Sequence, residues 1–303
     1  PSHRALNFTD LVPLRIIVKT DWNGDRITEV LLELKEELGG IKYAVSDDGS
    51  DLKKGIREAG IPQVHDLTHH IALILERLLS SDEIFKFLCT SSSQIRLKYV
   101  QTALAHIIAP VQRTKSRYLN ITPLTNWWRQ MIALIEKGDK KEEIEKVEWL
   151  KPYKKYIEEL SEIMTSILKI EKILKNEGLS ESTERKCLKI LTGIKSEKGE
   201  YVRNCLKKYF KETRTLLGNT KMILITSDII ESAFGKYKNY ISKNQMAGIT
   251  NLVLCMAAFT SDLSQKTIKK ALETVTIGDI NKWSAKYIGT TLYARRVALI
   301  SGL

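Results

Sequence analysis

Two acidic motifs, far apart along the chain, carry residues whose type and setting could do chemistry. The first is Val45–Ser50, in which Asp47 and Asp48 stand between an apolar run and Gly49. A carboxylate at the end of a buried strand offers the oxygen ligands that Mg²⁺ prefers, and bound magnesium ions can catalyse phosphoryl transfer. The alternative is a strand-ending Asx turn, which needs no function. The local sequence is compatible with both.

The second motif is Thr226–Lys238, in which Glu231 lies near the start of a predicted helix, Ile229–Tyr240. An acidic side chain in the first turn stabilises the helix dipole, and Asp228 with Glu231 could form a capping box. Ordinary helix-start chemistry is therefore the alternative interpretation.

A third group consists of His65, Asp66 and His69. Histidines four residues apart could bind a metal ion if both lay on one helix, with Asp66 as a further ligand. Apart from the neighbouring His70, the other histidines of the chain are His3 and His106. Neither is close enough in sequence to complete such a metal site. The alternative is that the histidines cap a helix or form hydrogen bonds in the core.

Short elements must position the first motif. Leu14–Lys19 is a β-branched run that ends in turn residues, which predicts a strand. Ile27–Leu38 has apolar residues at helical spacing, and Ile41–Val45 predicts a second strand. This order indicates a parallel crossover unit, in which ligands bind beyond the carboxyl ends of the strands. The following predicted elements are the helix Leu52–Ala59, the strand Gln63–His65 and the helix Leu67–Leu79.

Beyond these elements the pattern is almost wholly helical up to about Gly218. The predicted helices are Ser93–Ala109, Pro123–Glu136, Glu142–Asn176, Ser182–Gly193 and Lys198–Leu217. A long apolar stripe between Tyr153 and Ile170 keeps no heptad, so it indicates the core of a helical bundle. Ala247–Thr260 predicts a buried, nearly apolar helix. Two smaller helices follow, Gln265–Val275 and Asp279–Gly289, the second capped by Asp279.

Composition narrows the class of partner. The 303 residues are 43% hydrophobic, and the net charge of +12 with a pI near 9.4 favours an anionic partner such as nucleic acid. The basic excess lies in the middle and C-terminal parts. No apolar stretch reaches the roughly 20 residues that a membrane span needs, so we expect no membrane partner. Four separated cysteines form no CxxC motif, which fits a reducing, cytoplasmic setting.

The two acidic motifs, with Val64–His69 between them, resemble the DDE transposases of insertion-sequence elements. In that family a strand ends in the second catalytic Asp, an insertion domain interrupts the core, and a returning helix carries the catalytic Glu. The resemblance implies an α/β fold, mostly helical overall, with a partial ribonuclease-H-like core interrupted by a large all-helical insertion. Residues 1–80 would be the first part of the core, 81–220 the insertion, and 221–303 the returning helix and C-terminal helices.

The resemblance also implies residue roles. Asp47 matches the second acidic residue, with Asp48 as the alternative register, and Glu231 matches the third. Asp47 and Glu231 would hold Mg²⁺ or Mn²⁺ and be the catalytic residues. His69 looks like a histidine that some related transposases keep, so it would sit near the active site with Asp66 and Asp48 as further neighbours.

Basic residues would contact DNA. Lys238 follows Glu231 by seven residues, which matches the Glu-to-Lys spacing of some bacterial family members. The DNA contacts expected on the core are Lys236, Lys238, Lys243, Arg295 and Arg296, and those on the insertion are Arg113, Lys115 and Arg117. Trp127 and Trp128 could stack on a flipped base, but packing in the bundle is the favoured alternative.

The chain departs from the family pattern in two respects. Ser227 and Leu224 replace the Arg and Tyr that precede the Glu in the family signature. The first catalytic Asp belongs on the first of three antiparallel strands, and Leu14–Lys19 looks like the third. We therefore expect the first Asp to lie upstream of Pro1.

The implied function is that of a magnesium-dependent DNA transposase, which cleaves and joins transposon ends by phosphoryl transfer. Its partner would be double-stranded DNA, both transposon ends and target, bound as a homodimer in the cytoplasm or, in a bacterium, at the nucleoid. One alternative is a transposase-derived or truncated DNA-binding protein without catalytic activity. Another is a helical scaffold with an unrelated α/β domain, which predicts that Asp47 and Glu231 lie far apart.

Overall fold

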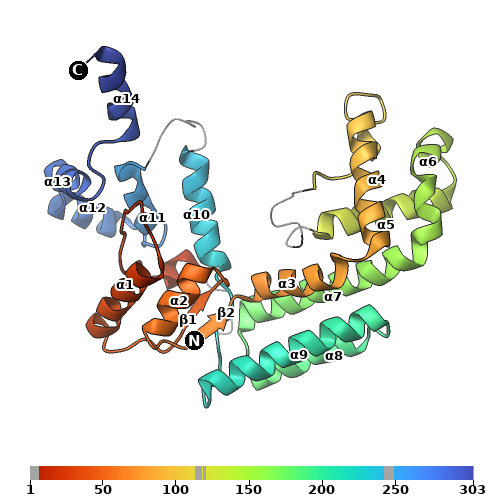
Figure 1. The fold of residues 1–303 in the computed structure, drawn as a ribbon, viewed down its shortest axis with the longest axis horizontal. Helices are drawn as coiled ribbons and strands as arrows, with labels where there is room; N and C mark the ends of the chain where they lie inside the picture. Colours follow the sequence, from red (N-terminus) through yellow and green to blue (C-terminus); the bar gives the residue numbers. More distant parts are fainter. Residues whose placement is uncertain (1–6, 113–117, 119–120, 242–248, 303) are drawn as a thin grey trace. The chain divides into compact units, whose positions relative to one another are not determined.

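The chain folds into helices almost throughout. The computed structural model describes residues 7–112, 118, 121–241 and 249–302, and it is 71% helix and 3% strand (Figure 1). Within the described residues, the sheet consists of β1 and β2 alone, and no ribonuclease-H fold is identified. The expected mostly helical character is confirmed, whereas the expected ribonuclease-H-like core stays a prediction.

The contacts divide the chain into two compact units. The first unit combines residues 1–63 with residues 226–303, and the second comprises residues 64–225. The second unit is therefore an insertion in the sequence of the first. This division places the helix Leu67–Leu79 in the helical unit. From the sequence, the boundary between the core and the insertion was expected at residue 80.

The first unit begins with a short 3-10 turn, η1 (Phe8–Asp10), and two packed helices. Helix α1 spans Gly24–Glu37 and α2 spans Ser50–Glu58. They approach closely because Gly55 faces Ile27 and Gly24 faces Lys54, where a Cβ atom on either glycine would collide. A small apolar core of Ile56, Ala59 and Ile61 packs against α1 and the start of β1.

A parallel crossover unit is present, but it is not the one expected from Leu14–Lys19 to Ile41–Val45. Strand β1 (Ala44–Ser46) pairs in parallel with β2 (Gln63–His65), and α2 connects them. The Ala44 N–H donates to the Pro62 carbonyl over 2.9 Å. The expected strand Leu14–Lys19 is wrong, because this segment has no regular secondary structure. Its β-branched residues favour an extended backbone, but a strand also requires a partner to complete its hydrogen bonds.

The second unit is a helical assembly. Its helices are α3 (Leu67–Leu79), α4 (Glu83–Tyr99), α5 (Ile121–Lys137), α6 (Lys141–Val147), α7 (Lys154–Glu177), α8 (Glu181–Thr192) and α9 (Glu197–Leu217), with the 3-10 turns η2 (Ala105–Ile107) and η4 (Glu148–Tyr153). Helix α7 packs against α5 and α8, and α9 against α8 and α3. The stripe predicted as bundle core is buried on α7, where Leu160, Ile163 and Ile170 are fully inaccessible.

Two predictions for this unit need correction. The single helix expected over Glu142–Asn176 is divided into α6, η4 and α7, because Pro152 lacks the N–H that a continuous helix requires. The helix expected over Ser93–Ala109 belongs to α4, which begins ten residues earlier and ends at Tyr99. Asp82 caps its start by accepting the Phe85 N–H, a local signal that apolar periodicity alone does not reveal.

The chain then returns to the first unit. The remaining helices are α10 (Asp228–Ile241), α11 (Cys255–Ala258), α12 (Gln265–Thr274), α13 (Ile277–Tyr287) and α14 (Leu292–Ser301), with the 3-10 turn η5 (Asn251–Leu254) before α11. The prediction that Ala247–Thr260 is buried is wrong for its described part, since η5 and α11 contain no buried residue. Thr276, not Asp279, is the N-cap of α13, and Asp279 completes its capping box. Within the described residues, no helix is both long and apolar enough to cross a membrane.

Candidate active site

Asp47 follows β1 directly, and the backbone around it is held in place. Its Oδ1 accepts the Gly49 N–H over 3.1 Å, which closes an Asx turn. The Gln63 side chain, at the start of β2, donates to the Ser46 Oγ over 2.9 Å and to the Asp47 carbonyl over 3.3 Å. Asp47 is half-buried and Asp48 is exposed. The Asx turn thus forms as the structural alternative predicted, and it also fixes where the carboxylate lies.

Glu231 is an exposed residue in the first turn of α10. The helix begins at Asp228, and the Asp228 N–H donates to the Thr226 Oγ1 over 3.2 Å. The Glu231 N–H donates to the Ser227 carbonyl over 3.2 Å as part of the helical ladder. The capping box expected from Asp228 to Glu231 stays a prediction, while the favourable placement of an acidic side chain near a helix N-terminus holds.

Asp47 and Glu231 belong to the same compact unit, although the helical insertion separates them in sequence. Carboxylate oxygens are the donors that Mg²⁺ and Mn²⁺ take. Yet no group of three or more His, Cys, Asp or Glu side chains that could hold a metal ion occurs in the described part of the chain. The donor type fits the implied ion, and the number of donors falls short of the trio that the resemblance implies.

The histidine group is not arranged as one helix. His65 lies in β2, whereas His69 lies in the first turn of α3, so the condition for a metal site on one helix is not met. Asp66 is fully buried between them as the N-cap of α3 and accepts the His69 N–H over 3.0 Å. The Tyr209 hydroxyl donates to the His65 carbonyl over 2.6 Å, and the His70 ring stacks on Tyr209. Asp66 thus caps α3.

Burial has an electrostatic consequence beside this cap. Desolvation raises the pKa of Tyr209 well above its ordinary value, and the nearby charge of Asp66 adds to the effect. Tyr209 therefore stays a neutral hydrogen-bond donor at physiological pH. The roles of His69 and Asp66 as neighbours of an active site stay predictions, since both residues belong to the second unit.

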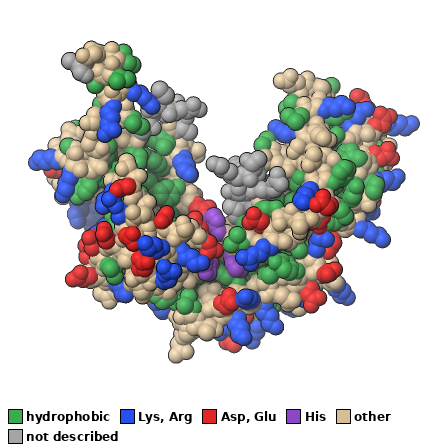
Figure 2. Space-filling model, in the orientation of Figure 1, with side chains coloured by type: hydrophobic (Ala, Val, Ile, Leu, Met, Phe, Trp, Pro, Cys, Tyr) green, Lys and Arg blue, Asp and Glu red, His purple; other side chains and the backbone are tan. Residues whose placement is uncertain are grey.

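The basic residues expected at DNA have varied surroundings. Lys238 and Arg295 are exposed, Arg296 is half-buried, and the Lys236 ammonium lies 5.8 Å from the centre of the Phe259 ring. Lys243 lies outside the described residues, as do Arg113, Lys115 and Arg117. Figure 2 shows Lys and Arg side chains interspersed with Asp and Glu on the visible face. The visible charges thus do not single out one basic surface.

The two tryptophans belong to the core of the helical unit. Trp128 is fully buried, and its indole N–H donates to the Ser92 Oγ over 2.8 Å. Trp127 is 6% exposed and donates to the Ile107 carbonyl over 3.0 Å. Packing, the favoured alternative, is confirmed, because neither ring presents a face on which a base could stack.

No protein-family model matches the chain, and neither the curated proteins nor the solved structures contain a match. The site therefore has to be judged on its own geometry.

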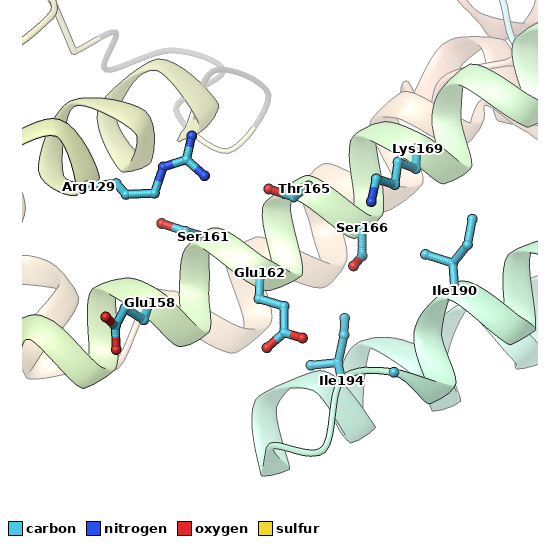
Figure 3. A pocket seen from close by; sticks show the side chains of 10 residues that line it. Arg129, Glu158, Ser161, Glu162, Thr165, Ser166, Lys169, Ile190 and Ile194 are labelled. Carbon is cyan, nitrogen blue, oxygen red and sulfur yellow. The ribbon is translucent and has the colours of Figure 1, made fainter. Parts of the chain in front are cut away.

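Two pockets were not anticipated from the sequence. One, of about 440 Å³ in the first unit, is mostly apolar and lies between residues 11–17, α10 and the η5–α11 segment. Ile230 and Phe234 of α10, on either side of Glu231 in sequence, line it. The other, of about 470 Å³, lies among α5, α7 and α8 of the helical unit (Figure 3). Polar residues at helical spacing opposite the apolar stripe of α7 were the available signal for this second pocket.

Proposed function

We propose that this chain is a DDE-type DNA transposase that cleaves and joins DNA by metal-dependent phosphoryl transfer, with Asp47 and Glu231 as catalytic metal ligands. One observation carries the proposal. The residues before and after the long helical insertion form one compact unit, and each part contributes one of the two carboxylates. A core interrupted by a helical insertion is the organisation that the resemblance implies.

Local geometry supports Asp47 in particular. Its position directly after β1 of a parallel pair is where ligands bind in sheets of this kind. The Gly49 N–H and the Gln63 side chain fix the turn, so the carboxylate is oriented before any ion or DNA arrives. When bound, Mg²⁺ or Mn²⁺ would supply the charge that activates an attacking hydroxyl and stabilises the leaving oxygen.

The decisive experiment measures strand cleavage on duplex DNA that carries the sequences flanking the gene. Asp47→Asn keeps the oxygen that accepts the Gly49 N–H but removes the charge, and Glu231→Gln keeps the helix. We expect each variant to lose roughly 100-fold or more of the cleavage rate, because a metal ligand contributes several kcal/mol of transition-state stabilisation. The melting temperature should stay close to that of the wild type.

Matched controls make the result specific. Asp48→Asn changes the neighbouring, exposed carboxylate, and Glu273→Gln changes an exposed carboxylate of α12. Both should retain cleavage. Loss of cleavage in Asp48→Asn alone would transfer the role to the adjacent residue, and full activity in both Asp47→Asn and Glu231→Gln would sink the proposal.

The alternative, a DNA-binding protein without catalysis, makes a different prediction in the same assay. Such a protein binds duplex DNA and retards it in a mobility-shift experiment. Its affinity for DNA falls steeply with salt concentration, because binding to the phosphates releases counterions. Cleavage is then absent in the wild type, and the two carboxylate substitutions leave DNA affinity unchanged. The proposed double-stranded DNA partner and homodimer are tested together by the stoichiometry of that complex.

A further inference from the structure

The pocket of the helical unit has the composition of a binding site. It is an open depression of about 470 Å³ among α5, α7 and α8, and α7 contributes most of its polar lining (Figure 3). Three hydroxyl-bearing residues of α7, Ser161, Thr165 and Ser166, face it. Ser161 and Ser166 are buried, whereas Thr165 is exposed, and a buried hydroxyl costs stability unless a partner accepts its hydrogen bond.

The Ser161 hydroxyl is an unpaired polar group beside this pocket. The residue is 6% exposed, and its Oγ is buried without a hydrogen-bond partner among the described residues. A buried hydroxyl left unpaired costs about 1 to 3 kcal/mol of stability. Figure 3 shows this hydroxyl on the side of α7 that Arg129 approaches from α5. A bound acceptor would remove that cost.

Two cations determine the charge of such an acceptor. Arg129 and Lys169 line the pocket with the three hydroxyls, and neither forms an ion pair with any described residue. A guanidinium matches the oxygens of a phosphate in a fork geometry, and an ammonium adds a point charge. Serine and threonine hydroxyls are common additional donors to phosphate.

The opposite part of the pocket limits the size of the anion. Glu158 and Glu162 also line it, and Figure 3 shows Glu162 extending toward α8. Lys154 lies 3.7 Å from Glu158 and neutralises part of that charge. A second or third phosphate would meet these carboxylates, whereas Ile190 and Ile194 of the same pocket offer an apolar surface.

We propose that this pocket binds a single phosphate ester, with its phosphate between Arg129 and Lys169 and the Ser161 hydroxyl as a donor to it. The organic part of the ester packs on Ile190 and Ile194. The phosphate can come from a free mononucleotide or from the backbone of a single-stranded nucleic acid. This site lies in the helical unit and does not depend on Asp47, Glu231 or the proposed transposase activity.

Calorimetric titration of the full chain tests the ligand class. The probes are deoxyadenosine monophosphate, deoxyadenosine, deoxyadenosine triphosphate and a single-stranded oligothymidine. We expect the monophosphate to bind, the nucleoside not to bind, and the triphosphate to bind more weakly than the monophosphate. Glu162→Gln should narrow the difference between the two nucleotides, because it removes the charge that repels the longer phosphate chain.

Substitutions test the residues. Arg129→Gln and Lys169→Gln should each weaken binding roughly tenfold, as expected for the loss of a charge-assisted hydrogen bond. Lys172→Gln, on the exposed surface of the same helix, is the matched control and should leave binding unchanged. Ser161→Ala should weaken binding about threefold while the melting temperature stays the same or rises, because the unpaired hydroxyl is removed. If Ser161 had only a structural role, its replacement by Ala would lower the melting temperature.

Each outcome decides the proposal. If the oligothymidine binds with the same dependence on Arg129 and Lys169 and the monophosphate does not, the phosphate comes from a nucleic-acid backbone. If both bind, a free nucleotide is also a ligand. Failure of both probes, equal binding of deoxyadenosine, or equal weakening by Lys172→Gln overturns the site. None of these results bears on the cleavage assay, since Asp47 and Glu231 are unchanged.

Discussion

A backbone hydrogen bond holds the carboxylate of Asp47, and another holds that of Asp66, but the two residues differ in burial. Asp66 is fully inaccessible and caps α3, which accounts for an acidic residue at that position. Asp47 is half-buried at the end of β1, and its Oδ2 makes no hydrogen bond with the described residues. The difference in burial therefore distinguishes the two carboxylates: that of Asp66 is inaccessible to a ligand, whereas that of Asp47 is partly accessible.

Cys187 makes the stability of the helical unit depend on pH. Burial, followed by the nearby charge of Glu177, raises the pKa of its thiol from 9.0 to about 12. The folded state therefore keeps the proton that the unfolded state releases. The stabilisation is fully present below about pH 9 and is lost as pH rises from there toward 12.

We expect the free energy of unfolding to fall by up to about 1 kcal/mol per pH unit in that window, and less steeply in Cys187→Ala. Urea titrations at about pH 8 and about pH 10.5 measure both slopes. Tyr156 and Tyr209, whose pKa values burial also raises, contribute equally to both proteins. Identical slopes in the wild type and the variant would contradict the assignment to Cys187.

At the scale of elements, the ends of helices are fixed by features that apolar periodicity does not contain. Helix α7 begins after Pro152 and ends at Gly178, which has a φ of +68°. A Cβ atom at Gly178 would lie 2.9 Å from the Met222 Cγ and 3.0 Å from the Ile223 carbonyl. Two segments that are distant in sequence meet here, because Leu179 and Ile223 form an antiparallel bridge.

Gly138 provides a matched comparison for Gly178. Its φ is +74°, yet a Cβ atom there would meet nothing within 4 Å. Gly138→Ala should cost about 1 kcal/mol from the backbone conformation alone. Gly178→Ala should cost at least about 1 kcal/mol more, since its φ of 68° with ψ of 179° is essentially restricted to glycine and a backbone carbonyl must also move. Chemical denaturation measures the free energy of unfolding of both variants. Equal losses of free energy would contradict a steric role for the contact between Gly178 and residues 222–223.

At the scale of the whole molecule, the two units differ in how much core they contain. The helical unit buries a long row of α7 side chains, both tryptophans and Phe210. In the first unit, the described residues of η5 and helices α11 to α14 include none that is buried. The free energy of unfolding should therefore be concentrated in residues 64–225.

We expect residues 64–225, expressed alone, to fold into a helical protein that unfolds cooperatively. The reason is that the buried contacts of α5, α7, α8 and α9 lie within this range. Circular dichroism during thermal unfolding measures the helix content and the sharpness of the transition. A fragment that unfolds gradually, or lacks helix at room temperature, would show that the core depends on the first unit.

The sequence by itself determined the local elements and the order of the acidic motifs. Helix α3 and strand β2 have the predicted bounds, because apolar spacing and turn residues act over a few neighbours. Tertiary structure alone decided the rest. Leu14–Lys19 is not a strand because pairing needs a distant partner, and the Arg129–Ser161 pocket joins residues that only helix packing brings together. Likewise, the sequence identified Asp47 and Glu231, but the folded chain assigned both to one unit.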